Sequence, residues 1–244
     1  MLTRLRLVAG GTALAIGLYV LAASAPAAPP DLPKDSYKRA IDAEITSIQG
    51  LLKGGSPDKR AANTIKAEAM MLALYGEATG NAALTSQALQ VAEAAAKKDW
   101  KGADAAAKGL GSPKAGAAPK GPLHEQAKFD LDAAMSPFRL GKVGGLNIEA
   151  DIRAAVKGSP VKGPDAELIA VRSAAIASYA IHYPNDKAMM GNNKGKWEKL
   201  SKEMIDISKQ IAEEAKGGAN QQKLNALFKR LDANCTNCHN DFRD

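Results

Sequence analysis

The chain ends in the run Leu224-Asn-Ala-Leu-Phe-Lys-Arg-Leu-Asp-Ala-Asn-Cys-Thr-Asn-Cys-His-Asn-Asp-Phe-Arg-Asp244, and this stretch decides the fold. Apolar residues recur in it every three or four positions, at Leu224, Leu227, Phe228 and Leu231. That spacing predicts an amphipathic helix. Cys235, Cys238 and His239 continue the spacing, so on a helix all three project from one face.

The two cysteines and the histidine have the order Cys-x-x-Cys-His, which is the attachment signature of a c-type haem. In such a site two thiols add across the vinyl groups of the porphyrin, and the next residue offers its imidazole to the iron. Cys235, Cys238 and His239 are therefore the predicted binding residues of one covalently attached haem c.

Three other readings of the cysteine pair stay open. A redox-active dithiol is expected within a βαβ context, and no such pattern is visible. A structural zinc site needs four ligands, whereas only His124 and His182 remain as histidines and neither has a paired-ligand spacing. The third reading is a structural disulfide in an exported protein.

Composition favours a helical protein without a nucleic-acid partner. Aromatic residues make up only 5% of the 244 residues, and alanine, lysine, leucine and glutamate are abundant, which suits helical bundles. The formal net charge is +7, but lysines are scattered among acidic residues and form no basic stripe with interleaved aromatics. An acidic redox partner and simple solubility explain this charge equally well.

Residues 1–28 have the features of an export signal. Two arginines precede an apolar stretch from Leu7 to Ala23, and small residues follow, so we expect cleavage near Ala25 or Ala28. The alternative is an uncleaved membrane anchor, since the stretch approaches the roughly 20 apolar residues that span a bilayer. Export predicts a periplasmic protein, and covalent haem attachment normally takes place outside the cytoplasm.

The first folded segment is expected over residues 31–110, and it contains neither cysteine nor histidine. Its predicted helices run over about 37–52, 57–80, 84–98 and from 100 onward. Ser56 is the expected N-cap of the second helix, with Pro57 in its first turn and Gly80 at its end. Residues 111–122 are rich in glycine and proline and are predicted to be a linker.

The second folded segment is expected over residues 123–244. Its predicted helices run over about 123–140 with an interruption at Pro137, 148–156, 168–184, 196–217 and from 219 to the end. The predicted fold class is all-α: a C-terminal four-helix bundle carrying a c-type haem, preceded by a second, haem-free helical bundle.

The C-terminal half resembles the cytochrome c-prime family, the class II c-type cytochromes. The tail Cys235-x-x-Cys238-His239-x-x-Phe242-Arg243 matches the ending of that family, and the order of the preceding helices also fits. The resemblance implies that both thiols form thioethers and that His239 is the proximal ligand. It also implies that Arg243, four residues beyond His239, lies beside the proximal pocket, where it pairs with a propionate or tunes the potential. The alternative for Arg243 is a solvated tail residue.

The sixth coordination position separates two functions within this resemblance. Met135 is the natural thioether candidate, although the family's distal position falls nearer Lys142 or Val143. A valine beside two glycines would leave an open distal pocket, and Met135 would then belong to the core. Three further residues remain as candidate ligands: His182, Met189 and Met190.

These features predict a carrier of single electrons rather than an enzyme, because no acid–base pair or nucleophile stands in a recognisable spacing. Redox proteins are its expected partners. A gas-binding protein for nitric oxide or carbon monoxide is the first alternative, and a haem-bearing scaffold that docks a partner is the second. Relatives in the family often pair through their first two helices. The chain is therefore expected either to form a homodimer or to cover that surface with its own N-terminal bundle.

Overall fold

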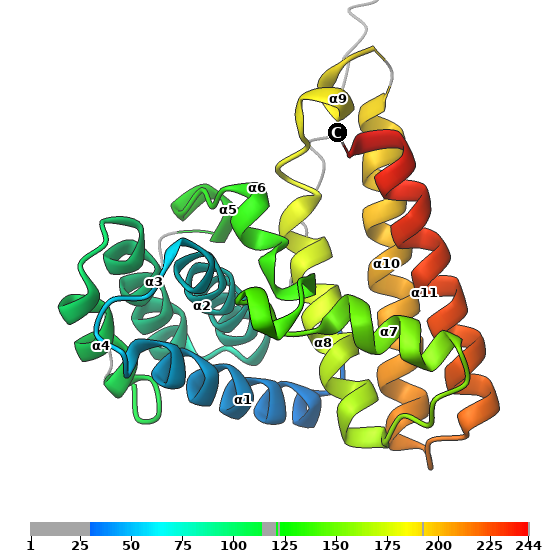
Figure 1. Ribbon diagram of the computed structural model, residues 1–244, viewed down its shortest axis with the longest axis horizontal. Helices are drawn as coiled ribbons and strands as arrows, with labels where there is room; N and C mark the ends of the chain where they lie inside the picture. The colour runs from blue at the N-terminus through cyan, green and yellow to red at the C-terminus, as the bar shows by residue number, and fades with distance from the viewer. Residues whose placement is uncertain (1–29, 114–120, 122, 192, 244) are drawn as a thin grey trace, which may run out of the picture.

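The computed structural model describes residues 30–113, 121, 123–191 and 193–243, all of them in helices, turns and loops without a strand (Figure 1). The α-helices are α1 (Lys34–Leu52), α2 (Lys59–Thr79), α3 (Ala82–Ala96), α4 (Trp100–Gly109), α5 (Leu123–Gln126), α6 (Leu131–Ala134), α7 (Ile148–Val156), α8 (Gly163–Ala180), α9 (Asp186–Met189), α10 (Asn193–Lys216) and α11 (Gln221–Phe242). Two 3-10 helices, η1 (Ser136–Phe138) and η2 (Gly141–Val143), lie between α6 and α7. The predicted all-α class is confirmed.

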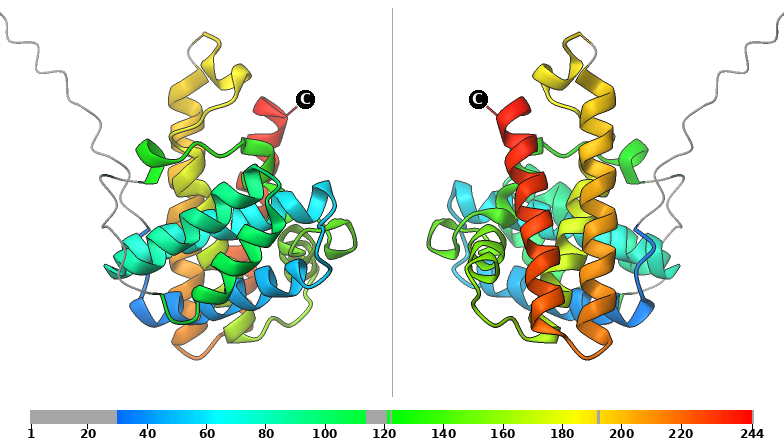
Figure 2. Two further views of the ribbon diagram at one scale, coloured as in Figure 1. Left: turned by 90° about the vertical axis from the view of Figure 1, so that its left-hand side faces the viewer. Right: turned by 90° about the vertical axis from the view of Figure 1, so that its right-hand side faces the viewer.

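The helices gather in two groups. In Figure 1, α1 to α4 lie on the left, where α2 packs on α3, α3 packs on α4, and α1 contacts both α2 and α4. On the right, α8 packs most extensively on α10, α10 packs on α11, and α11 packs on α7. Figure 2 shows α10 and α11 side by side along their lengths, so the helix with the cysteines lies on a long neighbour.

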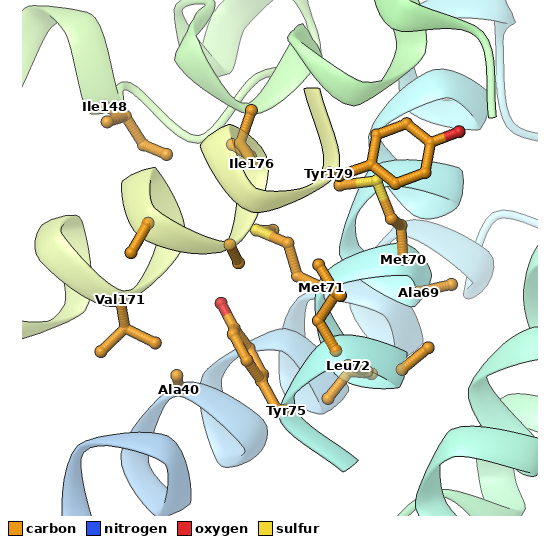
Figure 3. Packing of buried hydrophobic residues seen from close by; sticks show 14 of the residues in the cluster. Ala40, Ala69, Met70, Met71, Leu72, Tyr75, Ile148, Val171, Ile176 and Tyr179 are labelled. Carbon is orange, nitrogen blue, oxygen red and sulfur yellow. The ribbon is translucent and has the colours of Figure 1, made fainter. Parts of the chain in front are cut away.

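One cluster of buried side chains runs through both groups. Met71 and Tyr75 of α2 point into the space between α1 and α8, where Ala40 and Val171 also lie, and Ile176 of α8 belongs to the same cluster (Figure 3). All five residues are inaccessible to solvent. Burying apolar surface is the main driving force of folding, so the two segments predicted as domains are held together by a shared apolar core.

The predicted start of the second helix needs a correction. Asp58, not Ser56, is the N-cap of α2, and its carboxylate accepts hydrogen bonds from the amides of Arg60 (2.9 Å) and Ala61 (2.8 Å). A carboxylate satisfies two free amides and also interacts favourably with the positive end of the helix dipole. The predicted end is confirmed, since Gly80 adopts the left-handed conformation (φ 71°).

The helical stretch predicted over 123–140 is largely wrong. Only the single turns α5 and α6 form, followed by η1. Tyr179 of α8 is one reason, because its hydroxyl donates to the carbonyl of Phe129 at 3.0 Å and also accepts from the Phe129 amide. Asp130 then caps α6 at the amide of Asp132 (3.1 Å), and Pro137 has no amide to continue a helix. The side chains of Tyr179 and Asp130 thus take the place of helical hydrogen bonds, and Pro137 cannot donate one.

The last two long helices form close to their predicted positions. α10 begins at Asn193, three residues before the expected Lys196. α11 begins at Gln221 rather than near Ala219, because Ala219 has a positive φ (52°) and Asn220 caps the helix at the amide of Lys223 (3.1 Å). Both helices bury the apolar faces that their periodicity predicts.

The predicted signal over residues 1–28 and most of the predicted linker lie outside the described residues. Within the described residues, no helix combines the length and the apolar character needed to cross a membrane.

Candidate functional site

Cys235, Cys238 and His239 lie in the last two turns of the continuous helix α11. At about 100° per residue, the three positions fall within an arc of about 100° on the helix surface. Both cysteines are half-buried free thiols, whereas His239 is exposed. The helix therefore presents the three side chains on one side, as the sequence predicts, with the thiols turned inward and the imidazole outward.

The two thiols are held in their protonated form. Burial, reinforced by the charges of neighbouring carboxylates, raises the pKa of Cys235 to about 12 and that of Cys238 to about 11. Reactive dithiols have the opposite property, because their nucleophilic cysteine has a lowered pKa. The surroundings of Cys235 and Cys238 are therefore poorly suited to thiol–disulfide exchange at neutral pH.

His239 lies in a mixed electrostatic field. Partial burial and the positive charge of Arg243 lower its pKa, and Glu149 of α7 opposes this effect. Glu149 is paired with Arg153 at 2.5 Å. A lowered pKa keeps the imidazole neutral, which is the form that binds a metal. Arg243 thus acts on the residue beside which the family resemblance places it.

The C-terminal end of α11 is fastened by residues that sequence reasoning missed. The Phe242 ring packs edge-on against Trp197 at 5.3 Å, and Lys196 pairs with Asp241 at 2.6 Å. The side chain of Asn185 contacts two helices. Its Oδ1 accepts from the Ala188 amide and so caps α9, and its Nδ2 donates to the backbone carbonyl of Phe242 at 2.6 Å. The end that carries His239 is therefore anchored to the corner between α8 and α10.

Met135 and Cys238 pack against one common apolar cluster. Met135 is half-buried between α6 and η1 and packs against a small apolar cluster around Trp197 and Phe242. Cys238 packs against the same cluster. Met135 therefore shares a packing environment with one of the two thiols, and its role as a ligand stays a prediction.

The other distal candidates, Lys142 and Val143, form η2, and the next residue is pressed against α2. Thr64 of α2 donates its hydroxyl to the carbonyl of Gly144. Gly144 has a φ of 85°, and a Cβ atom there would lie 3.0 Å from the Ala61 amide nitrogen. Only glycine fits this close approach without strain. The N-terminal group of helices thus holds the segment that contains Lys142 and Val143 in place.

The remaining candidate ligands are His182, Met189 and Met190. The ring of His182 stacks on that of His124, with centroids 3.7 Å apart and planes 3° apart. Met189 and Met190 are 60% and 62% exposed at the tip formed by α9, which projects from the body beside the C-terminus (Figures 1 and 2). His182 is thus engaged with His124, whereas Met189 and Met190 are largely exposed.

Two further findings concern alternative uses of the site. In the described part of the chain, no three side chains among His, Cys, Asp and Glu are grouped so that they could hold a metal ion. A cavity of about 580 Å³ between α10 and α11 is lined mainly by charged residues, among them Lys202 and Arg230, and by none of the three attachment residues.

No protein-family model, curated protein or solved structure matches this chain.

Proposed function

We propose that this chain is an exported, mono-haem c-type cytochrome that carries single electrons. The observation that supports the proposal most is the placement of Cys235, Cys238 and His239 on one face of a single regular helix. In this proposal α7, α8, α10 and α11 are the haem-bearing bundle of cytochrome c-prime type, and α1 to α4 form a haem-free bundle. The compartment would be the periplasm, and the partners would be other redox proteins.

The residues fit a haem by the chemistry of their donors. Cys235 and Cys238 would hold the group by thioether bonds, and His239 would be its proximal ligand. Bound haem supplies a one-electron iron couple. Arg243 would place a fixed positive charge beside the proximal imidazole, and Asn185 would hold the last turn of α11 in position through the Phe242 carbonyl.

The packing of Met135 favours an electron carrier with a protein-derived sixth ligand. A thioether ligand must come from the same side of the molecule as the attachment residues, and Met135 packs against the same cluster as Cys238. If Met135 does not bind, the alternative is a five-coordinate iron that binds nitric oxide or carbon monoxide.

The first test is the visible spectrum of the exported, matured protein, ferric and ferrous, with and without carbon monoxide. We expect a low-spin haem spectrum that carbon monoxide leaves unchanged. A protein without any haem spectrum would overturn the proposal and return both cysteines to free thiols or a disulfide. A high-spin spectrum that shifts with carbon monoxide would replace electron transfer by gas binding.

Matched variants make this test specific. Replacing both Cys235 and Cys238 by alanine should abolish haem that survives a denaturing gel. Met135→Ala should convert the low-spin spectrum to a high-spin one that responds to carbon monoxide. Met204→Ala is the control, because Met204 is also half-buried and packs against the main core on α10. Equal spectral changes in both methionine variants would show a general loss of packing and not the loss of a ligand.

The haem-free helices have a proposed role in pairing. Of these helices, α1 and α2 lie on α8, the second helix of the proposed haem-bearing bundle. They would thereby cover part of the surface through which members of the family that the chain resembles form dimers. We therefore expect a monomer in sedimentation experiments. A dimer of the full-length protein would contradict this role and leave the docking of a partner as the function of α1 to α4.

A further inference from the structure

A group of buried polar side chains lies where α1 and α2 meet α8. Glu44 of α1 and Arg172 of α8 form a two-pronged ion pair, with Nε–Oε1 at 2.7 Å and Nη2–Oε2 at 2.9 Å. The Glu44 side chain is inaccessible to solvent, and the Arg172 side chain is only 11% exposed. Glu68 and Tyr75 of α2 complete the group, and both are fully buried.

Glu68 is the unusual member of this group. Neither of its carboxyl oxygens has a donor in full hydrogen-bonding geometry, although the Ser47 hydroxyl of α1 lies close enough to act on it, and the Tyr75 hydroxyl is also unpartnered. Arg172 already uses two of its nitrogen atoms on Glu44. Leaving an ionised carboxylate buried without a donor costs several kcal/mol, so natural proteins rarely do it.

The carboxyl of Glu68 lies against that of Glu44. Two ionised carboxylates only accept hydrogen bonds, so their oxygens cannot bond to each other. A proton on one of them turns it into a donor and removes one of the two negative charges. The group then contains one carboxylate, one guanidinium and one neutral acid, so its net charge is zero.

We propose that Glu44 and Glu68 form a buried proton-binding site that fastens α1 and α2 to α8 through Arg172. The proton resides on Glu68, since Glu44 alone has the bidentate contact with the guanidinium. This inference does not depend on the proposed haem function.

The surrounding charges agree with this assignment. Burial, followed by the negative charge of Glu44, raises the pKa of Glu68 well above its ordinary value. Burial raises the pKa of Glu44 as well, but Arg172 opposes that effect directly. The Ser47 hydroxyl of α1 and the guanidinium of Arg172 oppose the raised pKa of Glu68, but burial outweighs both. Two more titratable groups face the site: Tyr37 of α1 adds to the effect of burial in raising the pKa of Tyr75, and Asp151 of α7 lies within the field of Arg172.

Solvent can reach the outer side of the site. A cavity of about 280 Å³ between α7 and α8 is lined by Ile148, Asp151, Ile169 and Arg172, among others. Arg172 therefore separates this cavity from the two glutamates.

The sign of the pH dependence follows from the raised pKa. The folded protein binds this proton more tightly than the unfolded chain does, whose glutamate has a pKa near 4.5. The stabilisation is fully present below that value and is lost as the pH rises toward the pKa of the folded protein. The contact between α1, α2 and α8 should therefore weaken from mildly acidic toward alkaline pH.

Glu68→Gln tests the proposal without removing the fold, because the amide has the same shape and stays a neutral donor to Glu44. Urea unfolding of the full-length protein is followed from about pH 5 to about pH 8. Relative to the variant, the unfolding equilibrium constant of the wild type should rise by up to about tenfold per pH unit, as loss of one proton requires. Glu203→Gln on the exposed face of α10 is the control and should follow the wild type.

Infrared spectroscopy provides a second readout. The carbonyl band of a protonated carboxylic acid should be present at neutral pH in the wild type and in Glu203→Gln, and absent in Glu68→Gln. Parallel stability profiles, or the absence of that band from the wild type, would overturn the proposal. It would also be overturned if sodium, potassium or calcium ions stabilised the wild type but not Glu68→Gln, since a bound cation would then occupy the place of the proton.

Discussion

Removal of the guanidinium at position 172 is the sharpest test of what holds the two groups of helices together. Arg172→Met keeps an unbranched side chain of similar length but leaves Glu44 without its partner. Glu44 is inaccessible to solvent, so it must then take up a proton in the folded state. Breaking a buried ion pair by removing one partner typically costs about 3–5 kcal/mol.

The pH dependence of that cost can be estimated from the free energy needed to keep Glu44 protonated. At pH 7 a glutamate lies two and a half units above its ordinary pKa of 4.5. Holding it protonated there costs about 1.4 kcal/mol per unit, or roughly 3.5 kcal/mol. At pH 5 the same term falls to less than about 1 kcal/mol. The destabilisation by Arg172→Met should therefore shrink by about 2.7 kcal/mol between pH 7 and pH 5.

The assay is urea unfolding at both pH values, followed by circular dichroism. Arg139→Met is the control, because Arg139 pairs with Asp132 at 2.5 Å while their side chains are 41% and 58% exposed. Exposed pairs contribute about 1 kcal/mol or less, so the control should have a small effect. If Arg172→Met costs no more than Arg139→Met, or costs the same at pH 5 and pH 7, the ion pair does not hold the junction as described here.

Three other perturbations have defined outcomes. Phe228→Ala removes a fully buried ring from α11 and should lower the free energy of unfolding by about 3–5 kcal/mol in urea titrations. Burial and the neighbouring His124 lower the pKa of His182. The wild type should therefore lose stability relative to His182→Gln as the pH falls below about 6.5. Parallel curves of unfolding free energy against pH for the two proteins would contradict this. Asn185→Asp keeps the cap of α9 but cannot donate to Phe242, so amide exchange should become faster in the last turn of α11 and remain unchanged in α9.

The long helices could be predicted from the sequence because their information is local. Apolar residues three and four apart mark one face of α10 and α11, and that face is the buried one in the structure. Residues 123–140 show the opposite case. They have helical composition, but the Tyr179 hydroxyl occupies the amide and carbonyl of Phe129, fifty positions away. A competing partner at that separation leaves no local signal.

The shared helix face of Cys235, Cys238 and His239 could be predicted for the same reason, since the three residues are neighbours on one helix, and its attachment of a haem stays a prediction. The residues around it could not, because Asn185 and Trp197 reach α11 only through the tertiary fold. The buried ion pair was missed although a signal existed. Glu44 stands seven residues after Tyr37 and four before Ile48, on the apolar face of its own helix. A charged residue there requires a partner, but the partner is 128 positions away.

The contacts of α1 and α2 change how the role of the N-terminal helices, α1 to α4, has to be tested. Deleting residues 31–120 would be the simplest test for a docking module if these helices were only tethered to the rest. The structure argues against a simple deletion, because it would expose Val171 and leave Arg172 without Glu44. It would also release Gly144, and with it the segment that follows Met135, from Thr64. A changed haem spectrum in such a truncation would therefore report lost packing as much as a lost partner. Point substitutions on the exposed surface of α3 and α4, which face away from α8, separate the two effects (Figure 1).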